Sequence, residues 1–93
     1  MRLNIQEVQT IKAAVARLDK EAKIFLFGSR IDPSKKGGDI DLLILSKYLE
    51  EIDSIAILKR IYEQMDEQKI DILIAKDDQE PFVQLALSKS IQL

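Results

Sequence analysis

The sequence predicts a small α/β protein of the α+β kind, in which about three strands form a mixed sheet and helices pack mainly on one face of that sheet. Two observations carry this prediction. Apolar residues recur every three or four positions in three stretches of the chain, which is the spacing of one face of an α-helix. Three short apolar runs, typical of buried strands, alternate with these stretches. The length of 93 residues predicts one domain, residues 1–93, with one core.

The first elements are a helix, a strand and a loop. Residues 4–20 carry an apolar stripe at helical spacing, and residues 23–27 form an apolar run that predicts a buried strand ended by Gly28. Residues 29–38 contain a proline, two adjacent lysines and paired glycines, which are typical of a loop. The stripe of the first helix consists of Ile5, Val8, Ile11, Val15 and Leu18.

Two further strands and two helices follow. Residues 39–45 and 69–75 predict the second and third strands, and residues 47–67 between them have helical spacing. Residues 78–81 predict the start of a last helix that runs to Ile91. The proline at position 81 fits this start, because proline is tolerated in the first turn of a helix. The apolar stripe of the longer helix consists of Leu49, Ile52, Ile55, Leu58, Ile61, Tyr62 and Met65.

The order of the elements predicts the strand directions. A strand–helix–strand crossover joins parallel neighbours, so the second and third strands should be parallel. The loop at residues 29–38 leaves no room for a crossover helix, so the first two strands should be antiparallel. We expect the second face of the sheet to stay open. That face could dock another chain, as could the stripe of Phe82, Leu85 and Ala86 on the last helix, although covering the core is the simpler role of this helix.

The residue types that are missing from the chain restrict its chemistry. Without histidine or cysteine, Ser-His-Asp and Cys-His catalysis, structural zinc sites and disulfides are excluded. A metal ion would therefore need oxygen ligands. The net charge of -2 speaks against direct binding to a nucleic-acid backbone. The first residues do not resemble a signal peptide and no apolar run is long enough to span a membrane, so we expect a cytoplasmic protein.

Three aspartates in the predicted strands form the candidate site. Strand alternation places Asp39 and Asp41 on one face, with their Cβ atoms roughly 7 Å apart. The run that begins Ile70-Asp71 echoes the run that begins Ile40-Asp41, and in parallel pairing Asp71 would lie about 5 Å from Asp41. Three such carboxylates suit one or two Mg²⁺ ions. Singly, each has a simpler interpretation: Asp39 as an exposed turn residue, and Asp71 as an edge residue paired with Lys69.

Gly28-Ser29-Arg30 directly follows the first predicted strand. Glycine lets the backbone approach a ligand closely, backbone N–H groups and a serine hydroxyl can cradle phosphate, and arginine adds positive charge. A plain turn is the simpler interpretation of these three residues alone. Together with the aspartates they favour a nucleotide site.

The combined motif resembles the DNA polymerase β-type nucleotidyltransferase superfamily, and most closely the minimal nucleotidyltransferases of prokaryotes. The likeness rests on Gly28-Ser29, nine further residues, Asp39-x-Asp41 at the start of a strand, and Asp71 in the next. Those relatives commonly act as the antitoxin half of HEPN–nucleotidyltransferase pairs. One departure is Ile31-Asp32, where many relatives carry a further basic residue.

The resemblance implies the nucleotidyltransferase fold and a role for each motif residue. Gly28 and Ser29 would hold the triphosphate, assisted by Arg30. Asp39 and Asp41 would bind two Mg²⁺ ions, and Asp71 would complete the second metal site and help to activate an attacking hydroxyl.

By the same resemblance, the activity would be that of a protein adenylyltransferase within EC 2.7.7. It would move AMP from ATP, or the corresponding group of another nucleoside triphosphate, to a tyrosine of a HEPN toxin. The alternative is a non-catalytic antitoxin that neutralises its partner by binding. A small-molecule transferase of the aminoglycoside-modifying kind would need a second lobe, and receiver-type domains lack the Gly-Ser turn.

Overall fold

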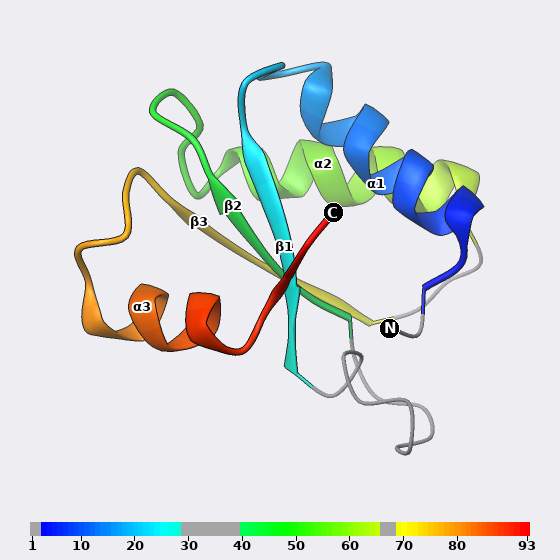
Figure 1. Ribbon diagram of the computed structural model, residues 1–93. Helices are drawn as coiled ribbons and strands as arrows, with labels where there is room; N and C mark the ends of the chain where they lie inside the picture. The colour runs from blue at the N-terminus through cyan, green and yellow to red at the C-terminus, as the bar shows by residue number, and fades with distance from the viewer. Residues whose placement is uncertain (1–2, 29–39, 66–68) are drawn as a thin grey trace.

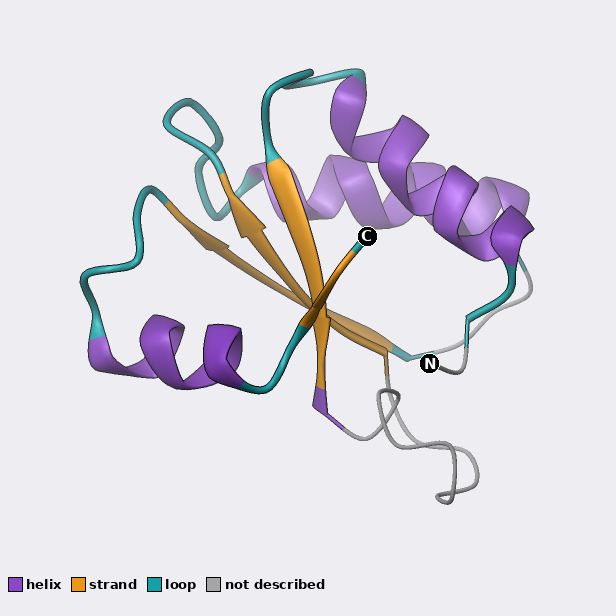
Figure 2. Cartoon of the chain, in the orientation of Figure 1, coloured by secondary structure: helices purple, strands orange, loops and turns teal. Residues whose placement is uncertain are grey.

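The computed structural model describes residues 3–28, 40–65 and 69–93. Within these residues, the strands form one sheet in the order β3-β2-β1-β4 (Figures 1 and 2). β1 pairs antiparallel with β2 and β4, and β2 pairs parallel with β3, so the predicted mixed sheet and its strand directions are confirmed. The elements are α1 (Ile5–Ala16), β1 (Lys23–Phe27), β2 (Ile40–Leu45), α2 (Asp53–Gln64), β3 (Ile70–Ala75), α3 (Pro81–Ser88) and β4 (Ile91–Gln92).

The described helices lie on both faces of the sheet. Figure 1 shows α1 and α2 on one side and α3 on the other. Ile40, Leu42 and Ile44 of β2 face α1 and α2 in the main core. Leu43, on the opposite face, is fully buried beneath Val83 and Ala86 of α3. The expectation of an open second face is therefore wrong: an apolar central strand needs cover on both faces, and α3 supplies part of it.

The first helix is shorter than its apolar stripe suggested. It begins at Ile5 because Asn4 and Glu7 form a capping box: the Glu7 N–H donates to Asn4 Oδ1 at 2.8 Å, and the Asn4 N–H donates to Glu7 Oε1 at 3.0 Å. It ends at Ala16 rather than residue 20. Both ends of the predicted stripe, Ile5 and Leu18, are exposed, so only the middle of the stripe contributes to the core.

The second helix begins six residues later than predicted. The buried Ser46 hydroxyl accepts hydrogen bonds from the N–H groups of Tyr48 and Leu49, at 3.1 and 3.0 Å, which fixes a turn after β2. α2 then starts at Asp53, whose carboxylate accepts the Glu50 N–H at 2.7 Å. Its buried residues are Ile57 and Ile61.

The chain ends in a strand that the sequence did not indicate. α3 stops at Ser88, and Ile91, predicted to be helical, lies in β4 opposite Leu26 of β1. β4 has two residues, too few to show an alternating pattern.

Candidate active site

Asp41 and Asp71 lie side by side at one end of the sheet. They occupy the same register position of the parallel pair β2–β3, so their backbones are separated by the inter-strand spacing of about 4.8 Å. Phe27, the last residue of β1, is the partner of Asp41 on the other side. The structure thus places Asp41 and Asp71 on neighbouring strands at the end of the sheet where Gly28 follows β1, and the predicted pairing of the two aspartates is confirmed.

The apolar neighbours of Asp41 determine which face it occupies. Ile40 and Leu42 are fully buried in the main core, and successive side chains of a strand point to opposite faces. Asp41 therefore lies on the face of α3, where it is half-buried, and Asp71 lies exposed on the same face. A shift of β2 and β3 by one residue would turn both carboxylates toward the core and expose the isoleucines next to them. The hydrophobic pattern of the strands therefore keeps Asp41 and Asp71 on this face.

Gly28 fits against the Asp41 carboxylate as no other residue could. Its φ is +80°, in the left-handed region that L side chains rarely adopt. A Cβ built on Gly28 would overlap Oδ2 of Asp41 and lie 3.2 Å from its Cγ. Because Gly28 has no side chain, the Asp41 carboxylate of β2 has room next to the end of β1.

The other predicted site residues, Ser29, Arg30 and Asp39, lie outside the described residues. Within the described ranges, no group of three or more acidic side chains could hold a metal ion. Asp41 and Asp71 nevertheless supply adjacent carboxylate oxygens on one face, the donor type that Mg²⁺ prefers. The residues present therefore fit a magnesium site to which Asp39, two residues before Asp41, would add.

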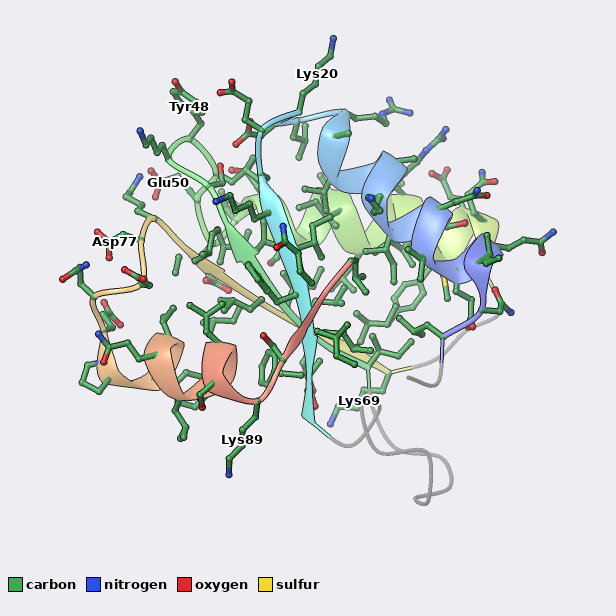
Figure 3. All side chains as sticks on the ribbon, in the orientation of Figure 1. Lys20, Tyr48, Glu50, Lys69, Asp77 and Lys89 are labelled. Atoms are coloured by element: carbon green, nitrogen blue, oxygen red, sulfur yellow. The ribbon has the colours of Figure 1, made fainter. Side chains whose placement is uncertain are left out.

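A second polar cluster, which sequence reasoning missed, lies at the opposite end of the sheet. The buried Ser46 hydroxyl donates to Asp19 Oδ2 at 2.5 Å, and the Glu21 N–H donates to Asp19 Oδ1 at 3.0 Å. A cavity of about 330 Å³ adjoins these residues. Tyr48, which lines the cavity, lies at this end of the sheet in Figure 3, and Lys69 lies near the opposite end. The sequence carries no signal for the cluster beyond a serine directly after a strand.

The sequence of the chain matches a known protein family. Its sequence model matches residues 8–92, nearly the whole chain, and the chain therefore belongs to the nucleotidyltransferase domain family. Transfer of nucleotidyl groups, as in EC 2.7.7, is the activity of this class, and a nucleoside triphosphate and a divalent metal are its usual requirements. No curated protein matches the chain closely. None of its described helices has the length and apolar character to cross a membrane.

Proposed function

We propose that the chain is a Mg²⁺-dependent nucleotidyltransferase that moves AMP from ATP to a hydroxyl group of a partner protein. The observation that carries the proposal is the alignment of Asp41 with Asp71 on one face of the sheet, in a chain of the nucleotidyltransferase family. Two carboxylates on one face of neighbouring strands repel each other, and a cation bound between them would relieve this repulsion. A site of this kind is therefore better explained by metal and phosphate binding than by stability.

The ligands of the metal would be Asp41, Asp71 and Asp39. When bound, magnesium supplies the positive charge that stabilises the attacking and leaving oxygens of an in-line displacement at phosphorus. This chemistry requires no histidine, in agreement with a chain that has none.

The protein residues would then position the reactants. Gly28, with no Cβ, lets the backbone after β1 approach a triphosphate, and Ser29 and Arg30 would hold its phosphates. The acceptor oxygen bonds to the α-phosphorus, the bond from this phosphorus to the bridging oxygen breaks, and pyrophosphate leaves. Asp71, whose carboxylate is exposed at the site, orients the acceptor hydroxyl and takes up its proton.

The proposed acceptor is a tyrosine of a HEPN-type toxin that is encoded beside the chain, and both would act in the cytoplasm. This part rests on the resemblance of the Gly28-Ser29 and Asp39-x-Asp41 motif to the minimal nucleotidyltransferases. Modification would silence the toxin and make the chain its antitoxin.

A second candidate function is neutralisation by binding alone. The observation that favours it is the apolar surface of α3, where Phe82 and Leu85 are each 57% exposed. Such a surface can bind a partner without any chemistry. The two functions differ in whether neutralisation requires the aspartates.

Label transfer from α-labelled ATP tests the two functions directly. We expect Mg²⁺-dependent labelling of the co-encoded protein, and at least a hundredfold loss in Asp41→Asn, because a ligand and its charge are removed. Asp78→Asn is the matched control, since Asp78 is exposed and lies just beyond the opposite end of β3. Full labelling by Asp41→Asn would refute the assignment of the site. Toxin neutralisation without any labelling would support the binding function instead.

A further inference from the structure

The outer edge of β3 carries a set of backbone hydrogen-bonding groups that no described strand uses. The Ile40 N–H donates to Lys69 O, and the Ser46 N–H donates to Ala75 O, both at 3.0 Å. In a parallel pair, alternate residues direct both backbone groups to the neighbouring strand. The backbone N–H and C=O groups of Ile70, Ile72 and Ile74 consequently point away from β2. β3 is the end strand of the sheet, and no described segment pairs with this edge.

An apolar row on α2 lies beside the same edge. Ile55, Leu58 and Tyr62 are spaced by three and four residues and form one row along the helix. Residues on the other side of α2, Ala56 and Arg60 among them, line the groove toward α1. Leu58 and Tyr62 therefore lie on the side of α2 away from α1, and Ile55, four residues before Lys59 of that groove, lies on the outer surface of the helix beside them. β3 is the strand that α2 contacts most, and Leu58 of α2 packs against the same core as Ile72 and Ile74 of β3.

The row is well exposed. Ile55 is 67% and Tyr62 is 37% accessible to solvent. The edge of β3 is thus bordered by apolar side chains on one face of the sheet and by Asp71 on the other. A strongly apolar end strand of six residues, whose outer edge pairs with no described segment, is a ready template for another strand.

We propose that an extended segment of the acceptor polypeptide binds as an additional strand on this edge of β3. Its backbone would pair with Ile70, Ile72 and Ile74, in the mode of recognition known as β-augmentation. A residue with a hydroxyl group would lie on the face of Asp71, and its apolar neighbours in sequence would lie on the face of Ile55 and Tyr62. The proposal rests on the proposed function and adds to it a substrate class: an apolar–hydroxyl–apolar segment.

Charge disfavours a second copy of the chain as the occupant. Two copies of the chain could pair their β3 edges in antiparallel fashion. If Ile70, Ile72 and Ile74 of both copies all take part, Ile72 lies opposite Ile72 of the second copy. The two copies of Asp71 then lie diagonally across the seam on one face, about 7–8 Å apart. Like charges directly opposite each other destabilise a sheet, and at this diagonal separation the repulsion is weaker but has the same sign. A segment with an uncharged hydroxyl residue at that position avoids this repulsion.

Amide hydrogen exchange, followed by NMR at single residues, tests the proposal on the intact chain and its complex with the co-encoded protein. In the free chain, the amides of Ile70, Ile72 and Ile74 should exchange fast, whereas those of Asp71 and Leu73 are protected by bonds to β2. In the complex, the amides of the three isoleucines should slow by at least tenfold. Unchanged exchange would overturn the proposal, and so would protection that depends on the concentration of the free chain, because it would identify a second copy.

Two pairs of variants test the same edge through catalysis. Ile72→Pro removes one outward N–H, and proline is tolerated at such an edge position, whereas Ile72→Ala removes side-chain contacts but keeps the N–H. We expect the KM for the acceptor protein to be about tenfold higher for Ile72→Pro than for Ile72→Ala. Ile55→Lys should raise this KM, and Ile5→Lys, at a similarly exposed position on α1, should not. Equal KM values within both pairs would refute the binding edge.

The outcomes separate this inference from the proposed function. Labelling of the partner without protection of the three amides would refute the binding edge alone. Protection of the amides without labelling would refute the transfer reaction and keep the edge as a docking site. Binding of Mg·ATP to each variant, together with its thermal unfolding, shows whether the substitutions leave the remaining site and the fold intact.

Discussion

The close contact between Gly28 and Asp41 predicts that Gly28→Ala is destabilising for two separate reasons. The φ of +80° at position 28 disfavours an L residue by about 1–2 kcal/mol. The new Cβ would also overlap Oδ2 of Asp41 and force this side chain from its rotamer, which costs about 0.5–1.5 kcal/mol. We therefore expect the substitution to lower the free energy of unfolding by about 1.5–3.5 kcal/mol.

A double-mutant cycle with Asp41→Ala separates the two contributions. The overlapping Oδ2 is then absent, and the remaining contact of the new methyl group, 3.5 Å to the Cβ of residue 41, is an ordinary one. In this background Gly28→Ala should cost only the backbone penalty, so the coupling between the two sites should be about 0.5–1.5 kcal/mol. Urea unfolding of the four proteins measures it. Equal costs in both backgrounds would refute the argument that Gly28 makes room for the carboxylate.

Three further predictions concern stability and metal dependence. Ser46→Ala leaves the N–H groups of Tyr48 and Leu49 without their acceptor and should lower the free energy of unfolding by about 1–3 kcal/mol; the exposed Ser88→Ala should change it by less than about 0.5 kcal/mol, and equal effects would contradict the buried network. Asn4→Ala removes the cap of α1 and should cost about 1 kcal/mol in the same assay. Chelation of divalent ions should abolish label transfer and Mg²⁺ should restore it, whereas transfer that persists in the chelator would rule out the metal site.

The candidate site could be predicted because it depends on strand alternation. Ile40 and Leu42 must face the core, so Asp41 must face away from it. The similar run around Asp71, joined through a crossover helix, then predicted a parallel neighbour, in which Asp71 would lie beside Asp41 if the two similar runs were in register. The structure has that register. What the sequence could not show is the fit of Gly28 against Asp41, because it depends on a backbone conformation and on the distance between two strands.

Helix boundaries were predicted less well because single side chains compete for them. Apolar spacing continues backwards from α2 to Leu49, but Ser46 binds two N–H groups there and holds a turn. Side-chain hydrogen bonds of this kind compete with helix formation, and periodicity does not register them. The sequence indicated covering the core as the simpler role of the last helix, but it did not show which face is covered: α3 is short, and only its packing shows that Val83 and Ala86 lie over Leu43.

The apolar residues of α2 explain why a binding surface is harder to predict than a catalytic site. The stripe proposed for this helix joined Ile52 and Ile55 with Ile61, whereas in the structure the first two are exposed and Ile61 is buried with Ile57. The helix has apolar residues on two sides, and the sequence alone does not tell which side faces the core. Once the fold assigns Ile57 to the core, Ile55 and Tyr62 are left exposed beside the outer edge of β3, with which no described segment pairs. Apolar side chains that the core does not need, next to backbone groups that no described strand uses, are what a binding edge requires.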